Sequence, residues 1–192
     1  MKTLKIKIES ISAMLMHSDQ TANPLNSYAK ALKKITSKRQ KTDDDHAAIS
    51  ELEFVAGLYY SKKDGYHMPG VNLESCFIAS AKHSKKGTLL KQAMIIGSDG
   101  TFDFEHKDLS PTDLFNVGDY TDMRTVKVGT SKCIRTRPIF DKWSVSFEVF
   151  LDTDKVDVAD FKAIVENAGR YVGLGDFRPR YGRFVVTQFK SV

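Results

Sequence analysis

The chain is poor in cysteine and has no long hydrophobic run, and each shortage excludes a class of protein. Its two cysteines, Cys76 and Cys133, lie far apart, with no second cysteine beside either. This spacing excludes a zinc knuckle and a disulfide framework, so we expect two free thiols and no metal site. Every apolar run is shorter than the roughly 18 residues of a membrane span, so we expect no membrane partner.

Common catalytic and cofactor-binding motifs are missing as well. The sequence contains no Walker-type phosphate loop, no nucleophile elbow and no zinc-binding spacing. We therefore expect no cofactor. The first residues alternate lysine with apolar residues, which is not the pattern of a signal peptide, and we expect a soluble, cytoplasmic protein.

The chain does have enough apolar residues for one core, together with a surplus of positive charge. Its 192 residues are 41% hydrophobic, which predicts a single domain over residues 1–192, with insertions at about 18–41 and 119–138. The formal net charge is +5 and the isoelectric point is about 9.1. This surplus suits an anionic partner, but by itself it separates nucleic-acid binders from ordinary basic proteins poorly.

Alternation of apolar and polar residues predicts the strands. Residues 4–8 alternate apolar side chains with charged ones, and residues 143–151 form the clearest alternating segment of the chain. A last strand is predicted over residues 183–189. Two short apolar pieces, residues 93–96 and 101–104, are separated by a turn sequence of glycine, serine and aspartate, which predicts a hairpin.

Apolar residues at helical spacing predict three helices. The first covers residues 43–60 and begins with a capping box of Thr42 and Asp45. The second is capped by Asn72 and ends in a basic last turn, and the third follows Asp157. The expected buried stripes of the last two helices are Leu73, Cys76, Phe77 and Ala81, and then Val158, Phe161, Ile164, Val165 and Ala168.

Two basic segments have too few apolar residues to be placed in a core. Residues 18–41 show no helical or strand period, so we expect a mobile excursion. Residues 119–138 are predicted to form a two-stranded basic projection around the turn Gly129-Thr130-Ser131. Charge runs are usually solvated, so RNA contact and simple exposure both remain open for residues 18–41.

Residues 168–186 interleave glycines, arginines and aromatic residues between the third helix and the last strand. Glycines let a backbone approach a ligand closely, arginines neutralise phosphates, and aromatic rings stack on bases. The pattern therefore points to nucleic acid. The alternative is a solvated surface on which the arginines form ordinary ion pairs with Asp176 or Glu166.

Strand, helix, glycine-rich loop and strand in this order form the second half of a ferredoxin-like unit. The first strand, the helix after Pro69-Gly70 and the later hairpin supply the other half. We therefore predict an α+β fold, with a ferredoxin-like or RRM-like antiparallel sheet and helices on one face.

Two motifs together resemble a known family. One is residues 66–82, a proline-glycine turn that leads into a helix with small residues near its end. The other joins residues 173–175 to residues 181–184. With the strand at 143–151 between them, they resemble the RAMP superfamily, the RRM-like subunits of CRISPR effector complexes, along most of the chain. The chain departs from that pattern in being short and in the interruption of its glycine run by residues 176–180.

The resemblance implies a backbone subunit that binds single-stranded guide RNA and stacks with copies of itself and with other effector subunits in an antiviral ribonucleoprotein. It implies that residues 119–138 are a thumb between guide and target strand, and that residues 18–41 contact the target or a neighbouring copy. The implied RNA-binding residues are Lys33, Lys34, Lys38, Arg39, Lys82, Arg124, Lys127, Lys132, Arg135, Arg137, Tyr171, Gly173, Gly175, Arg178, Arg180 and Arg183.

Two alternatives stay open, although the sequence favours a binding protein over an enzyme. Some RAMP relatives cleave RNA, and Asp19, His17 and His46 are the candidate catalytic residues of such an endonuclease. The acidic run that precedes His46 is better explained by the preference for carboxylates at a helix start than by a metal. The short length also suits a viral or mobile-element mimic that caps a host filament and inhibits a CRISPR complex.

Overall fold

The computed structural model describes residues 1–192 apart from the side chain of Val128, and its fold is α+β. Its contacts divide the chain into two compact units. The sheet unit comprises Met1–Met14, Tyr60–Lys107 and Phe140–Val192, and the helix-hairpin unit comprises Leu15–Tyr59 and Asp108–Ile139. The two predicted insertions both fall in the helix-hairpin unit, whereas the single domain over the whole chain stays a prediction.

The sheet unit is built on one large antiparallel sheet. Its strands follow the order β10-β1-β9-β6-β4-β3, and β5 also pairs with β9. Each of these pairs is antiparallel, which confirms the predicted sheet type. The strands are β1 (Lys2–Ser10), β3 (Tyr60–Ser61), β4 (Gly65–Met68), β5 (Met94–Ile95), β6 (Gly100–Asp103), β9 (Ser144–Leu151) and β10 (Phe184–Ser191).

The alternating side chains of the paired strands β1 and β9 give the sheet one apolar face. Leu4, Ile6 and Ile8 of β1 are buried, and Val145, Phe147, Val149 and Leu151 of β9 are buried in the same alternating manner. The two strands pair so that Ile6 lies opposite Phe147. One face of the sheet is therefore apolar and must be covered.

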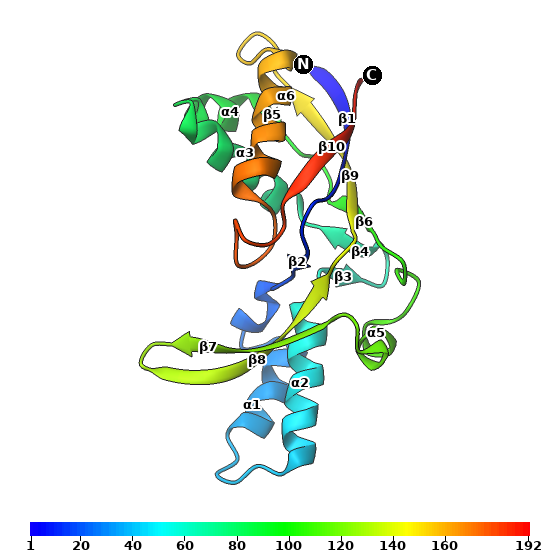
Figure 1. Ribbon diagram of the computed structural model, residues 1–192, viewed down its shortest axis with the longest axis vertical. Helices are drawn as coiled ribbons and strands as arrows, with labels where there is room; N and C mark the ends of the chain where they lie inside the picture. The colour runs from blue at the N-terminus through cyan, green and yellow to red at the C-terminus, as the bar shows by residue number, and fades with distance from the viewer. The chain divides into compact units, whose positions relative to one another are not determined.

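Helices α3 (Gly70–His83) and α6 (Val158–Asn167) cover the apolar face of the sheet (Figure 1). Phe77 of α3 stacks on Phe147 with ring centroids 5.7 Å apart, and Phe161 of α6 packs against Phe189 of β10 at 6.3 Å. The Ser80 hydroxyl donates to the carbonyl of Ile164 at 2.9 Å and joins the two helices. The predicted apolar stripe of α3 is confirmed as buried, and so is that of α6 apart from Val158, which is half-buried.

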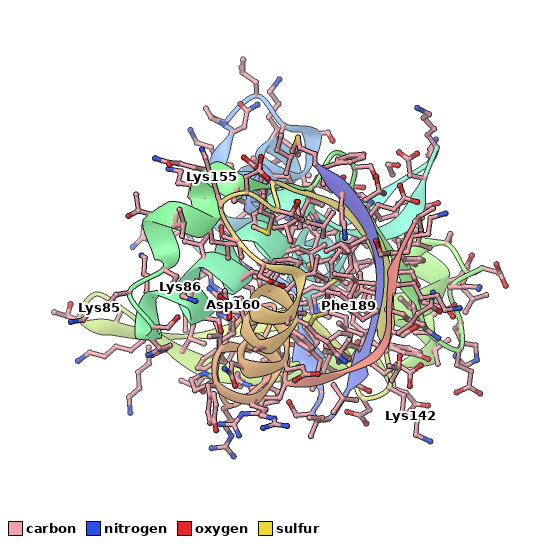
Figure 2. The ribbon with its side chains drawn as sticks, turned by 90° about the horizontal axis from the view of Figure 1, so that it is seen from above. Lys85, Lys86, Lys142, Lys155, Asp160 and Phe189 are labelled. Carbon is pink, nitrogen blue, oxygen red and sulfur yellow. The ribbon has the colours of Figure 1, made fainter. Side chains whose placement is uncertain are left out.

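The order of these elements is compatible with a ferredoxin-like arrangement. Along the chain they follow as β1, α3, β6, β9, α6 and β10, and in the sheet β10, β1, β9 and β6 are neighbours. The short helix α4 (Gly87–Ala93), which was not predicted, follows α3. Lys86 directly precedes α4 and forms an ion pair of 2.6 Å with Asp160 of α6; Figure 2 labels both side chains.

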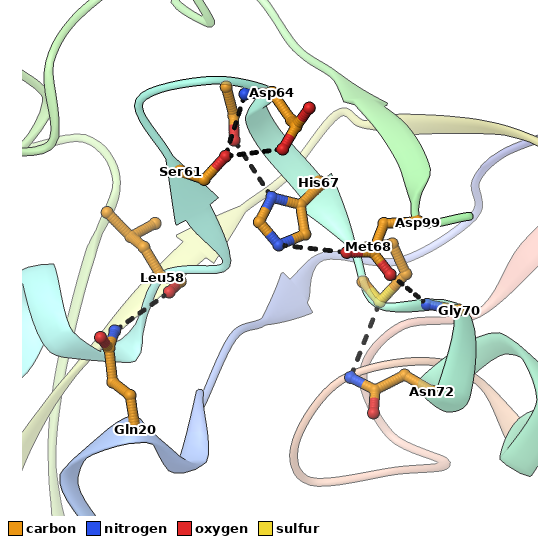
Figure 3. A network of polar contacts seen from close by, with 10 residues as sticks. Gln20, Leu58, Ser61, Asp64, His67, Met68, Gly70, Asn72 and Asp99 are labelled. Atoms are coloured by element: carbon orange, nitrogen blue, oxygen red, sulfur yellow. Dashed lines mark hydrogen bonds and ion pairs between the residues drawn. The ribbon is translucent and has the colours of Figure 1, made fainter.

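The start of α3 differs from the prediction. The helix begins at Gly70, and Asn72, the predicted cap, lies inside it. The cap comes from Asp99, whose Oδ1 accepts a hydrogen bond from the Gly70 N–H at 2.9 Å (Figure 3). His67 Nε2 lies 3.7 Å from the other carboxylate oxygen of Asp99. A carboxylate is favoured at a helix N-terminus, and this one is delivered by a loop distant in sequence.

The predicted hairpin of residues 93–104 is wrong. Both β5 and β6 pair with β9 instead of with each other: Met94 lies opposite Leu151, and Phe102 lies opposite Val145. The glycine-containing turn carries the chain along one edge of β9 from one end to the other. A long strand can pair with two short ones in this way, and the local turn sequence does not reveal it.

The helix-hairpin unit contains helices α1, α2 and α5 and most of a three-stranded sheet in the order β2-β8-β7, of which Met14 and Phe140 are counted with the sheet unit. The predicted pairing of two strands is confirmed for β7 and β8, which pair in register from Thr121 and Pro138 to Val128 and Ser131. The elements are a 3₁₀ helix (Asp19–Ala22), α1 (Ser27–Thr36), α2 (Asp43–Gly57), α5 (Pro111–Val117), β2 (Met14–Leu15), β7 (Thr121–Val128) and β8 (Ser131–Phe140).

The capping box that starts α2 is confirmed. The Asp45 N–H donates to Thr42 Oγ1 at 3.3 Å, and the Thr42 N–H donates to Asp45 Oδ2 at 3.1 Å. The helix ends at Gly57 rather than near Tyr60. The Gln20 side chain donates to the carbonyls of Ala56 at 2.7 Å and of Leu58 at 3.5 Å, the second bond being drawn in Figure 3, and so satisfies carbonyls where the helix ends.

The prediction that residues 18–41 contain no helix is wrong, because α1 lies there. Asn26 caps it by accepting from the Tyr28 N–H at 2.8 Å. Tyr28, Ala31, Leu32 and Ile35 are half-buried at helical spacing. No residue of α1 is fully buried. Because this apolar stripe is short and lies among lysines, its helical spacing was not recognised in the sequence.

In the part of the chain described by the structure, no helix combines the length and the apolar character needed to cross a bilayer.

Candidate nucleic-acid interface

The glycine-rich loop, residues 173–183, leads from the end of the α6 segment to β10. A π-helical turn (Ala168–Val172) follows α6, and the Gly173 N–H donates back to the Ala168 carbonyl at 2.9 Å. The Leu174 N–H donates to the Gly182 carbonyl at 2.9 Å, which closes the loop on itself. The Gly182 N–H donates to the Ala13 carbonyl at 2.8 Å, so the closed loop is tied to the segment after β1.

Two glycines are required for this closure. Gly182 has φ of +74°, and a Cβ built on it would lie 1.7 Å from the Leu174 carbonyl oxygen. Gly173 has φ of +78°, and its Cβ would lie 2.8 Å from the Tyr181 carbonyl oxygen. Only glycine accepts both the left-handed backbone and the close approach. The close backbone approach made by these two glycines is therefore to the loop itself, and Gly173 is buried.

A groove of about 590 Å³ lies between the loop and the C-terminal half of α3. Two aromatic side chains in its wall are unusually exposed, Tyr171 at 64% and Phe177 at 44%. The small side chain of Ala79 leaves space on the helix side, and His83 lies one turn further on. The lining residues are Ala79, His83, Tyr171, Val172, Gly175, Asp176, Phe177, Arg178 and Pro179.

Positive charge gathers on the loop beside this groove. Arg178, Arg180 and Arg183 are all exposed, and Arg183 is held by a 2.8 Å hydrogen bond from its Nε to the Pro179 carbonyl. Among the described side chains, neither Arg178 nor Arg180 forms an ion pair with a carboxylate. Exposed, unpaired guanidinium groups are well suited to bind phosphate. Lys82 is exposed in the last turn of α3.

The groove has a buried thiol beneath it. Cys76 of α3 donates through Sγ to the Gly173 carbonyl at 3.2 Å. Burial raises the pKa of Cys76 to about 12, although the nearby Arg178 guanidinium acts in the opposite direction. Cys76 therefore holds the loop against α3 as a neutral hydrogen-bond donor. The sequence marked it as a core residue but not as a support of the loop.

The arginines of the β7-β8 hairpin are in a different situation. Arg124 is paired with Asp122 on its own strand, with Nε 2.6 Å from Oδ2. Arg135 forms an ion pair with Glu53 of α2, and this carboxylate raises the pKa of Arg135. Glu53 also accepts from the Thr136 N–H at 2.9 Å. Arg135 therefore attaches the hairpin to α2, whereas Arg124 is held within β7. Arg137 is half-buried.

The hairpin tip carries exposed lysines. Lys127 and Lys132 lie directly opposite each other in the register of the two strands. Like charges in that position destabilise a hairpin, and a bound anion would relieve the repulsion. The tip therefore holds two like charges side by side.

The cations of residues 18–41 are exposed around the end of α1. Lys33 and Lys34 belong to its last turn, and Arg39 follows it. Lys38 forms an ion pair with Asp45 at 2.6 Å, and this hydrogen bond is the main reason that the pKa of Asp45 is lowered. Lys38 thus also supports the capped start of α2.

The three candidate catalytic side chains are exposed and belong to the helix-hairpin unit. His17 lies just after β2, where its carbonyl accepts from the Tyr59 hydroxyl at 3.2 Å. Asp19 begins the 3₁₀ helix capped by Ser18, and His46 lies in α2 near its start. Their catalytic roles stay predictions. Within the described residues, no three histidine, cysteine, aspartate or glutamate side chains gather as they would around a metal ion.

The open face of the large sheet offers a second hollow, of about 370 Å³. Its charges are of both signs, and Lys5 of β1 forms an ion pair of 3.3 Å with Glu148 of β9. Phe147 is the aromatic residue of its lining and is only 6% exposed. This hollow therefore lacks the exposed rings on which bases stack, whereas the groove beside the glycine-rich loop has them.

No protein-family model matches this chain, and no curated protein sequence matches it.

Proposed function

We propose that this chain is an RNA-binding subunit that resembles the RAMP-type backbone of a CRISPR effector complex. In this proposal the sheet unit is an RRM-like palm, the β7-β8 hairpin is its thumb, and the protein holds single-stranded guide RNA while stacking with copies of itself and with other subunits. It acts by binding and not by catalysis.

The observation that carries the proposal is the groove beside the glycine-rich loop. It combines exposed aromatic rings, Tyr171 and Phe177, with the exposed guanidinium of Arg178 in one concave surface. Rings and guanidinium groups together are what single-stranded nucleic acid requires, because the former stack on bases and the latter neutralise phosphates. A structural explanation would pair Arg178 with a carboxylate, as Arg135 is paired with Glu53.

The lysines of the helix-hairpin unit support the same partner. The facing pair of Lys127 and Lys132 is a local repulsion that an RNA phosphate would relieve. Lys33, Lys34 and Arg39 add exposed positive charge on the same unit. In the proposal, these residues add salt-dependent affinity but no sequence preference.

Binding of a labelled oligouridylate, followed by fluorescence anisotropy over a range of salt concentrations, tests the proposal. The wild-type protein is expected to bind, with affinity that falls steeply as salt rises. Arg178→Gln is expected to weaken binding about tenfold and to lower the salt slope by about 0.7, the value for one phosphate contact on a single strand. Absence of salt-dependent binding by the wild type would contradict the proposal.

The matched control is Lys155→Gln. It removes one positive charge from the same unit, but Lys155 precedes α6 whereas the loop follows that helix; its place is labelled in Figure 2. Its affinity and salt slope should equal those of the wild type. If both variants weaken binding equally, the net charge binds the RNA and the groove does not.

The same incubations separate binding from cleavage. RNA recovered from the wild-type protein is expected to be intact. If it is shortened, and if His17→Ala, Asp19→Ala or His46→Ala prevents the shortening, the protein is an endonuclease and the binding-only proposal is wrong.

Stacking of copies is tested with RNAs of increasing length. Mass photometry is expected to show complexes that gain protein copies as the RNA lengthens. A complex that keeps one copy on every length would contradict the polymerising role and favour a capping role.

A further inference from the structure

Phe177 combines an unfavourable backbone with an exposed ring. Its φ is 55°, in the left-handed region, where a bulky side chain is a true outlier. Two hydrogen bonds hold it there: its N–H donates to Asp176 Oδ1 at 2.9 Å, and its carbonyl accepts from the Tyr181 N–H at 3.3 Å. The ring is nevertheless 44% exposed, so an unfavourable backbone is combined with an aromatic surface that water can reach.

The strained residue lies in the wall of the groove, together with a second exposed ring. Tyr171 lies in the π-helical turn on the N-terminal side of the loop and is 64% exposed. Both rings line the same hollow, and Ala79 of α3 leaves its helix side open. Stacking a second flat ring on an aromatic ring that is exposed to water is energetically favourable.

The dimensions and charge of the groove select among flat ligands. The groove, of about 590 Å³, is broadly open to solvent and has room for a flat ring with a charged group beside it. Arg178 lies in the same wall and supplies a cation next to the rings. A base attached to a phosphate satisfies both features, whereas a phosphate backbone alone would leave the rings uncovered.

We infer that the groove takes one unstacked RNA base, which stacks on the rings of Phe177 and Tyr171 while Arg178 contacts its phosphate. This inference rests on the proposed function and goes beyond it, because it makes the groove a base-binding subsite within the RNA path. The strained backbone of Phe177 then has a function: it directs the ring toward the base.

The test uses a short oligouridylate that carries a single 2-aminopurine, whose fluorescence falls when it stacks on an aromatic ring. Wild-type protein is expected to quench the probe on binding. Phe177→Gly removes the ring and relieves the backbone, because glycine accepts a positive φ. It should keep or raise the thermal midpoint, lose most of the quenching and bind RNA about tenfold more weakly, without a change in the salt slope.

Two further variants change other residues that line the groove. Ala79→Leu fills the helix wall with a residue that favours helices and is expected to lose quenching while every loop residue is kept. Tyr171→Phe keeps the ring and is expected to quench as the wild type does. The matched control is Phe150→Ala, which removes a ring of 38% exposure from the open face of the sheet and should change nothing.

The outcomes separate this inference from the proposed function. Salt-dependent RNA binding without quenching, or with quenching that Phe177→Gly leaves unchanged, means that the groove holds backbone alone and overturns the inference, while the proposed function stands. If the wild-type protein binds no RNA, both fail. Quenching lost equally in Phe150→Ala places the base on the sheet and also overturns the inference.

Discussion

The glycine-rich loop and the β7-β8 hairpin are both basic, yet their arginines are used differently. In the hairpin, Arg124 and Arg135 are joined to Asp122 and Glu53. On the loop, Arg178 is paired with no carboxylate among the described residues, and the loop is closed by backbone hydrogen bonds and glycines instead. A loop that closes through its backbone leaves its charged side chains available to a ligand.

The comparison shows that basic composition alone does not identify a binding surface. Arginine forms structural ion pairs in the hairpin, whereas on the loop it is a cation available to a ligand. In the hairpin, the available cations are the lysines at the tip, where Lys127 faces Lys132.

The largest effect is expected from adding one methyl group to the closed loop. Gly182→Ala would place a Cβ 1.7 Å from the Leu174 oxygen, so the loop must open, at a cost of at least about 4 kcal/mol. Gly129→Ala at the hairpin tip is the matched control, since φ there is +60° and no atom lies within 4 Å of its Cβ. It should cost about 1 kcal/mol. Urea unfolding measures both, and equal losses would contradict the tight closure of the loop.

The thiols of the two regions should differ at alkaline pH. The pKa of Cys76 is raised from 9.0 to about 12 by burial, so the folded protein keeps a proton that the unfolded chain loses. The stability that the protonated Cys76 thiol contributes to the folded state is therefore complete below about pH 9. It is lost as the pH rises toward about 12, by at most about 4 kcal/mol.

The measurement is the unfolding free energy of the wild type minus that of Cys76→Ala, taken from about pH 8 to about pH 11. The difference should shrink as pH rises, and a constant difference would refute the buried neutral thiol. In the hairpin, Cys133 is only half-buried and should react with a thiol reagent before Cys76 does.

Loss of the carboxylate that anchors the hairpin should have an intermediate effect. Glu53→Gln breaks the ion pair with Arg135, and its side chain is only 10% exposed. The expected loss is about 2 kcal/mol in urea unfolding, with faster amide exchange along β8. Glu51→Gln on the same helix is the control and should be nearly neutral. If both variants lose equally, general charge on α2 is responsible rather than the anchor.

The smallest effect is expected at the hairpin tip, where stability and binding should change in opposite directions. Lys127→Glu places a carboxylate opposite Lys132 and should stabilise the protein by about 0.5 kcal/mol. The same change should weaken RNA binding. Lys127→Gln, which removes charge without creating a pair, should weaken binding less. Unchanged RNA affinity in Lys127→Glu would remove the tip from the proposed RNA path.

Local sequence predicted the elements whose partners are nearby or whose pattern is long. The alternation in residues 143–151 is strong because the strand is buried on one face only, and the capping box of α2 involves two residues three positions apart. By contrast, α1 was missed although Asn26 and a helical apolar stripe were present, because the stripe covers one side of a helix with no fully buried residue.

Pairing partners and caps that come from far along the chain were not predictable in this way. The turn at 97–100 looks like a hairpin turn, yet both flanking strands pair with β9, which comes much later in the chain. Likewise Asp99 displaced Asn72 as the cap of α3, because folding brought a carboxylate to the helix start.

The candidate site follows the same division. The sequence by itself determined the residue types of the glycine-rich loop, the apolar stripes of α3 and α6, and the alternation that makes one face of the sheet apolar. Only the tertiary structure brought Ala79 and His83 against the loop, turned Phe177 outward and paired the hairpin arginines with carboxylates. The physical reason is range: periodicity and capping act within a few residues, whereas grooves and ion pairs depend on which distant segments share a surface once the core has been buried.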